Sequence, residues 1–175
     1  RLADPGVLVD IGQVDDLKGI SAANGTVRIG GLTTHSTVAA SKAVPPILAE
    51  AAGTVADIQV RNRGTIGGNV VHADPASDLP PALTALAAIF HISGANGDRI
   101  IAAEDFFTGM FETALSEGEI LTAVEVAAEQ SGTGSAYVKL SNPASGYAMV
   151  GVAAVVTLDG GKFTAASVAL GGMIP

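Results

Sequence analysis

The most informative stretch of this sequence reads Arg61-Asn62-Arg63-Gly64-Thr65-Ile66-Gly67-Gly68-Asn69-Val70. Adjacent glycines let a backbone approach a ligand closely, because no Cβ blocks the path. Successive free N–H groups in such a turn can form a concave nest for a phosphate, and the side chains of Thr65 and Asn69 add donors at its edges. We therefore expect a loop at the mouth of a cleft, with several backbone amides pointing outward. On the residues alone, a plain structural turn stays open as the alternative.

Hydrophobic periodicity around this segment predicts a mixture of helices and strands. The Asn24-Gly25 pair is a strong turn signal ahead of the strand at Val27–Gly31. Residues 61–78 show no helical period, which predicts an irregular segment. The expected elements are, in chain order, a buried strand at Val7–Ile11, a helical turn at Asp15–Ile20, a strand at Val27–Gly31, a helix that opens with Thr37 and is capped by Ser36, a helix from Pro46, a helix over Leu79–Phe90 capped by Asp78, a hairpin around Asn96-Gly97, a short helix at Glu104–Phe107 and a strand at Ile120–Val126.

The composition of the chain changes at Gly132-Thr133-Gly134-Ser135, a small-residue stretch that is typical of a linker. Beyond it, three apolar runs predict strands at Tyr137–Leu140, Ala148–Leu158 and Val168–Leu170. The turn Asp159-Gly160-Gly161 joins the last two. We therefore predict an α+β protein with two domains, residues 1–130 and residues 131–175.

Composition excludes several classes of function. The net charge of −8 and the sequence pI of about 4.6 disfavour nucleic acid and anionic membranes as partners. No uncharged apolar run approaches the roughly 20 residues that a membrane-spanning helix needs. The absence of cysteine excludes disulfides and thiolate metal sites from this chain and fits a cytoplasmic location. The three histidines have no metal-ligand spacing, so no metal site is expected.

The glycine-rich stretch, continued by His72-Ala73-Asp74-Pro75-Ala76-Ser77-Asp78-Leu79-Pro80, resembles the second FAD-contacting motif of molybdenum-hydroxylase flavoprotein (medium) subunits. That family includes xanthine and carbon monoxide dehydrogenases. The resemblance implies an FAD-binding domain of the vanillyl-alcohol-oxidase type, followed by a small α+β domain with a three-stranded antiparallel sheet. Further segments that resemble the family in the same order are Leu8–Ile11, Ile29–His35, Asp105–Gly109, Gly118–Leu121, Tyr137–Leu140 and Gly146–Ala153.

The resemblance also implies roles for individual residues. Asp78 would hydrogen-bond the ribityl chain, Lys139 would lie near the isoalloxazine, and Tyr147 would border that ring. The residues that would wrap the pyrophosphate and ribityl region are Thr65, Ile66, Gly67, Gly68 and Asn69, and those that would touch the flavin or adenine are Ile120 or Leu121. Each has a structural alternative: a plain turn for Thr65 to Asn69, a helix cap for Asp78, a core position for Ile120 and Leu121, a solvated strand position for Lys139, and a half-buried aromatic position with a solvated hydroxyl for Tyr147.

The family's first FAD motif, a Gly-Gly-x-Ser loop, is not found ahead of the matched segments. We therefore expect this chain to hold only part of the FAD site and to be incomplete in both domains, lacking the first subdomain and the end of the second domain.

By this resemblance the protein would pass electrons from [2Fe–2S] clusters to an external acceptor through FAD. Its partners would be a molybdopterin-binding large subunit and a [2Fe–2S] small subunit. No catalytic acid or base is expected here, because the cofactor carries the redox chemistry. Two alternatives stay open: a flavin-free interaction fragment, and a hexapeptide-repeat acyltransferase suggested by Ile29-Gly30-Gly31 and Ile66-Gly67-Gly68.

Overall fold

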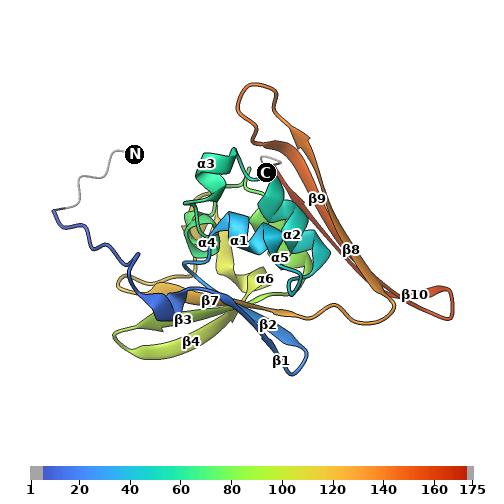
Figure 1. Cartoon of the computed structure of the whole chain (residues 1–175), viewed down its shortest axis with the longest axis horizontal. Coiled ribbons are helices and arrows are strands. Elements are labelled where there is room, and N and C mark those ends of the chain that lie inside the picture. Colours follow the sequence, from blue (N-terminus) through green and yellow to red (C-terminus); the bar gives the residue numbers. More distant parts are fainter. Residues whose placement is uncertain (1–5, 173–175) are drawn as a thin grey trace.

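A computed structural model describes residues 6–172, and its larger sheet has five antiparallel strands in the order β1-β2-β7-β3-β4 (Figure 1). Asn24 and Gly25 both adopt positive φ, so the expected turn is present, and it closes the first hairpin. Val27 and Ile29 point into the core from β2, while Arg28 between them is exposed. The strands are β1 (Ile20–Ala23), β2 (Thr26–Gly30), β3 (Ile89–Gly94), β4 (Gly97–Ala102) and β7 (Ile120–Ala127), and the small hairpin of β5 (Phe107–Gly109) and β6 (Glu112–Thr113) stands apart.

In the part of the chain that the structure describes, six short helices cover one face of this sheet, and a single 3-10 turn, η1 (Asp15–Leu17), precedes β1 (Figure 1). The apolar sides of α2 and α5 meet the sheet residues in one continuous core that includes Phe90 and Phe106, whose rings lie 4.5 Å apart. The helices are α1 (His35–Ala40), α2 (Pro46–Thr54), α3 (Ile58–Arg61), α4 (Ile66–His72), α5 (Leu79–Ala85) and α6 (Ala103–Phe106).

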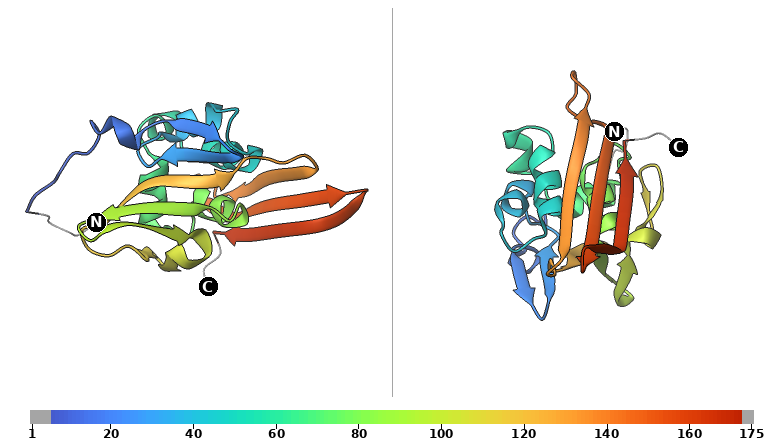
Figure 2. Two further views of the ribbon diagram at one scale, coloured as in Figure 1. Left: turned by 90° about the horizontal axis from the view of Figure 1, so that it is seen from below. Right: turned by 90° about the vertical axis from the view of Figure 1, so that its right-hand side faces the viewer.

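A second sheet lies on the other side of the helices and has the order β10-β9-β8 (Figure 2). Its strands β8 (Thr133–Ser141), β9 (Ala148–Asp159) and β10 (Lys162–Gly171) confirm the predicted three-stranded antiparallel sheet. Its inner face packs on α2 and α5, and Tyr137 and Ala153 belong to the common core. The chain crosses from the first sheet to the second between Ala127 and Thr133. The division into two domains in this region stays a prediction.

The outer face of the three-stranded sheet carries apolar side chains on every strand. Strand alternation places one residue in two on this face, and no element within residues 6–172 covers it (Figure 2, right). Val138 is 68% exposed, Phe163 77% and Val168 63%. The apolar residues of this outer face are Ala136, Val138, Leu140, Val150, Val152, Ala154, Val156, Leu158, Phe163, Ala166, Val168 and Leu170.

Three local predictions are wrong. Residues 7–11 form no strand, and Val7, Leu8 and Val9 are exposed, because no strand in the described chain pairs with them. The segment from Arg61 to Asp78 is not irregular throughout, since it contains α4. The helix expected over Leu79–Phe90 ends at Ala85, and Phe90 belongs to β3, because the helical spacing of apolar residues continues into a buried strand.

Other predicted elements are confirmed, with small shifts at their ends. The helix that was expected to open with Thr37 begins at His35, and the predicted cap Ser36 is wrong, because the Thr34 side chain caps the helix and accepts from the Thr37 amide. Both the Asn96-Gly97 hairpin and the helix from Pro46 lie where they were expected. The hexapeptide-repeat alternative is wrong, because antiparallel sheets and intervening helices replace the parallel rungs of a β-helix. Within residues 6–172, no helix is long and apolar enough to cross a membrane.

Candidate functional site

A cavity of about 370 Å³ opens between the start of α4, the turn ahead of α5, and the region around β8. Its walls come from segments that are far apart in the sequence. Of the predicted site residues, those that line it are Thr65, Gly68, Asn69, Asp78, Lys139 and Tyr147. The structure therefore brings six of the predicted residues into one place.

The predicted phosphate nest is wrong, because the backbone amides at the start of α4 already have acceptors. Thr65 caps the helix, and its hydroxyl accepts from the Gly68 amide at 3.1 Å, while its carbonyl accepts from the Asn69 amide at 3.0 Å. The amides of Ile66 and Gly67 donate to carbonyls of the loop that follows β2, those of Thr33 and Gly31, each at 2.9 Å. The glycine-rich segment thus gives a helix start held by a neighbouring loop, and side chains rather than free amides face the cavity.

The two adjacent glycines have different roles. A Cβ on Gly67 would lie 2.6 Å from the carbonyl oxygen of Gly31, so this glycine permits close packing between two backbone segments. A Cβ on Gly68 would meet only the Thr65 hydroxyl, at 3.1 Å, and Gly68 lines the cavity. Neither glycine has a positive φ. The absence of a side chain at Gly68 therefore allows a ligand to come close to the backbone, and the backbone there is not left-handed.

Polar side chains on this wall are held in fixed orientations. Ser77 donates a hydrogen bond to Asn69 Oδ1 at 2.7 Å, which directs the Asn69 Nδ2 donors elsewhere. Arg63 lines the cavity and is exposed. Arg61, which the sequence also placed near the site, donates instead to the carbonyls of Val55 and Ala56 at 2.8 and 2.7 Å. Its guanidinium therefore fixes the connection between α2 and α3.

Asp78 is the polar centre of the opposite wall. Its Oδ1 accepts from the Tyr137 hydroxyl at 2.7 Å, and its Oδ2 accepts from Lys139 Nζ at 2.9 Å. Lys139 Nζ also donates to the Thr54 carbonyl at 3.0 Å. The side chains of Asp78 and Lys139 are only 6% and 5% exposed, so the solvated position considered for Lys139 is wrong. Asp78 precedes α5, but its side chain does not cap the helix.

His35 extends the polar surface of the cavity. It is 3% exposed, and its backbone N–H donates to the Gly64 carbonyl at 3.0 Å. Burial lowers the pKa of His35, and the Asp78 carboxylate opposes this only in part, so the imidazole is neutral near pH 7. Its Nδ1 has no hydrogen-bond partner among the described residues. A buried nitrogen of this kind is rare, because leaving it unpaired is costly.

Four predicted residues lie away from the cavity surface. Ile66 and Gly67 are buried beneath it at the start of α4. Ile120 is 43% exposed at the beginning of β7, and Leu121 is 7% exposed in the core, and neither lines the cavity. The carbonyl of Leu121 does lie close to Gly31, where a Cβ would approach it to 2.5 Å. Their contact with a cofactor stays a prediction.

Sequence reasoning missed Tyr137, His35 and Ser77 as members of this region. Tyr137 lies two residues before Lys139 on a strand, and alternate strand residues share a face. That spacing was the signal that could have identified it. Ser77 and His35 carry no comparable local signal, because their partners Asn69 and Gly64 are chosen by tertiary packing.

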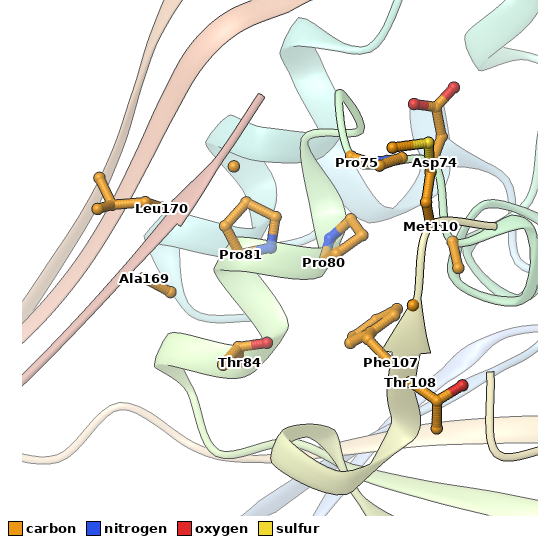
Figure 3. Close-up of a pocket in the computed structure, with 13 residues that line it drawn as sticks. Asp74, Pro75, Pro80, Pro81, Thr84, Phe107, Thr108, Met110, Ala169 and Leu170 are labelled. Carbon is orange, nitrogen blue, oxygen red and sulfur yellow. The ribbon is translucent and has the colours of Figure 1, made fainter. Parts of the chain in front are cut away.

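A second cavity of about 380 Å³ lies on another side of α5 (Figure 3). Its walls are mostly apolar and include Pro80, Pro81, Phe107, Met110 and Leu170. None of the predicted site residues lines it. Within residues 6–172, no group of three histidines, aspartates or glutamates is arranged to hold a metal ion.

Comparison with known proteins shows the family of the chain. Residues 1–128 match the family described as the FAD binding domain in molybdopterin dehydrogenase. The chain belongs to this family. A curated relative, the carbon monoxide dehydrogenase medium chain of Afipia carboxidovorans, is 40% identical over 173 residues, which is 97% of this chain and 60% of that protein. The medium chain from Hydrogenophaga pseudoflava is 39% identical over 100% of this chain and 62% of that protein.

Solved structures agree with this family membership. Carbon monoxide dehydrogenase from Hydrogenophaga pseudoflava superposes with a TM-score of 0.93 at 41% identity, over 98% of this chain and 61% of that one. Quinoline 2-oxidoreductase from Pseudomonas putida 86 gives a TM-score of 0.89 at 35% identity, over 98% and 61%. The chain thus spans about three fifths of the length of these relatives.

Proposed function

We propose that this chain is part of the FAD-binding, electron-transfer subunit of a molybdenum-containing hydroxylase. In such an assembly it would pass electrons from the [2Fe–2S] clusters of a small subunit to an external acceptor, while a large subunit holds the molybdopterin. Relatives named medium chain or FAD-binding subunit, from carbon monoxide and xanthine dehydrogenases, support this proposal. The carrying observation is that six predicted cofactor residues, from three separate segments, line one cavity.

The residues of the cavity fit a flavin nucleotide. Its volume falls within the range of about 300 to 1,000 Å³ that is usual for small-molecule sites. Thr65, Asn69 and Arg63 supply hydroxyl, amide and guanidinium donors on the wall where the resemblance places the pyrophosphate. FAD, when bound, supplies the two-electron and one-electron redox chemistry. The protein supplies shape, donors and charge.

The opposite wall suits the ribityl and ring portions. An ionised carboxylate has about four lone-pair positions, so Asp78 can accept from a ribityl hydroxyl in addition to Tyr137 and Lys139. Lys139 carries a nearly buried positive charge beside the cavity, where it would stabilise an electron-rich ring. Tyr147, 55% exposed on the loop before β9, offers an aromatic edge. We assign the larger domain to the vanillyl-alcohol-oxidase type and the location to the cytoplasm on the same grounds of family and composition.

The test is a flavin titration of the complete subunit and of its Gly68→Val variant. A valine there would project into the cavity and block close backbone approach, so the FAD dissociation constant should rise about tenfold or more. Gly53→Val is the matched control, because Gly53 is also an exposed helical glycine with room for a side chain but does not line the cavity. A wild-type subunit that binds no FAD contradicts the proposed function. Unchanged binding by Gly68→Val contradicts the placement of the site.

A further inference from the structure

Tyr137 lies directly behind the wall of the cavity rather than on its surface. Its neighbours Asp78 and Lys139 line the cavity, and Tyr137 does not. Its hydroxyl nevertheless donates to Asp78 Oδ1 at 2.7 Å, in a bond between buried partners. Tyr137 therefore contacts a predicted cofactor residue without reaching the space where a cofactor would lie.

The fold makes room for this contact at one position. Tyr137 and Lys139 are two residues apart on β8, so both side chains point toward α5 and can reach the same carboxylate. On the neighbouring strand β9, Gly151 lies opposite Lys139. A Cβ on Gly151 would collide with the Tyr137 hydroxyl and crowd its ring. The missing side chain of Gly151 is thus the slot through which the phenol reaches Asp78.

The phenol is a neutral donor to Asp78. Burial, helped by the Asp78 carboxylate, raises the pKa of Tyr137 far above its ordinary value, so the hydroxyl keeps its proton near neutral pH. No other described group donates a hydrogen bond to Asp78 Oδ1, because the Asp78 side chain does not cap α5. Hydrogen bonds to charged groups are stronger than neutral ones. Tyr137 therefore fixes which way the carboxylate points.

We propose that Tyr137 is a positioning residue of the cofactor site, which holds the Asp78 carboxylate and, through it, the Lys139 ammonium at the cavity wall. This inference rests on the proposed function. Without the phenol, Asp78 Oδ1 loses its donor, and the carboxylate can turn further toward Lys139. The ammonium would then be drawn from the cavity toward Asp78, because opposite charges at this burial attract strongly.

The experiment uses the complete subunit loaded with FAD and the isosteric substitution Tyr137→Phe. We expect the FAD dissociation constant to rise about tenfold, as for loss of one hydrogen bond to a charged group. We also expect the flavin midpoint potential to fall, because an ammonium closer to Asp78 offsets less of the negative charge gained on reduction. Gly151→Ala, which displaces the same hydroxyl, should change both quantities in the same direction.

Thr133→Val is the matched control. It removes a side-chain hydrogen bond from the same strand, that between Thr133 and Thr157 at 3.0 Å, at positions that do not line the cavity. Both readouts should stay at their wild-type values. If Tyr137→Phe lowers only the melting temperature and leaves the dissociation constant and the potential unchanged, the inference is overturned and the proposed function stands. If the wild-type subunit binds no FAD, it is the proposed function that fails.

Discussion

At the scale of single residues, the candidate site depends on the pairing of Asp78 with Lys139, which lie 61 positions apart in the sequence. The family resemblance implies a role for each residue, and the structure adds the contact between them. No local sequence pattern predicts that pairing, because it depends on how β8 packs against α5. The phosphate nest failed for a related reason, since the acceptors for the Ile66 and Gly67 amides come from a loop more than 30 residues away.

Glu119 provides a residue-scale prediction about pH. Hydrogen bonds from Arg99 at 2.8 and 2.7 Å, with help from the Ser116 amide, lower the pKa of Glu119 to about 2 from its ordinary 4.5. A carboxylate whose pKa is depressed by folding stabilises the protein above its unfolded pKa and loses that contribution as pH falls. The contribution of Glu119 should therefore be complete above about pH 5 and decline toward pH 2.

The measurement compares urea denaturation of the wild type and of Glu119→Gln across that range. The difference in unfolding free energy between them should be constant at neutral pH and shrink between pH 4.5 and 2. Glu117→Gln serves as the control, because Glu117 forms no ion pair with a described residue. A difference that does not change with pH contradicts the assignment.

At the scale of elements, turns were predicted well and helix ends poorly. The turn at Asn24-Gly25 and the hairpin at Asn96-Gly97 followed from turn chemistry that acts locally. Helix α4 was missed because its two glycines and short length hide the helical period, and because its start is fixed by tertiary hydrogen bonds. The end of α5 was missed because Phe90 fits both a helical stripe and a buried strand.

The start of α4 gives a prediction that separates the two glycines. Gly67→Ala should destabilise the protein by about 1 to 3 kcal/mol, because its Cβ would lie 2.6 Å from a backbone oxygen that cannot move freely. Gly68→Ala should be close to neutral, since helix propensity favours alanine by about 1 kcal/mol and offsets the close contact with the Thr65 hydroxyl. Urea denaturation of both variants tests this. Equal loss of stability in the two variants is the opposing result.

At the scale of the whole molecule, the order of elements was predictable and the layering was not. A mixed α/β part followed by three antiparallel strands was read from the sequence. That the helices lie between two sheets and share one core with both could not be read, because apolar spacing shows that a face is buried but not what buries it. The outer face of the second sheet shows the opposite case, because its apolar residues suggest a buried face, yet no described element covers it.

That outer face predicts the solution behaviour of this 175-residue chain. Contiguous apolar surface larger than a few hundred Å² promotes association, so the chain should bind a hydrophobic dye and scatter light at high concentration. Val138→Lys with Val168→Lys should reduce both signals, while the exposed positions keep the change in unfolding free energy within about 1 kcal/mol. Ser21→Lys, on exposed β1, is the control for added charge. Scattering that persists in the double variant places the association elsewhere.

The contacts of Asp78 also set an order of events during synthesis. A chain is made from its N-terminus, and both side chains that hold Asp78 lie on β8, 59 and 61 residues further along. A nascent chain that has emerged only as far as β7 therefore contains the glycine-rich wall of the cavity but neither anchor of the opposite wall. The two walls cannot face each other until the ribosome has released β8, and the strand β9 that carries the slot at Gly151 follows later still. Under the proposed function, capture of FAD by this cavity would consequently be a late step, which follows translation of the second sheet rather than guiding the folding of the first.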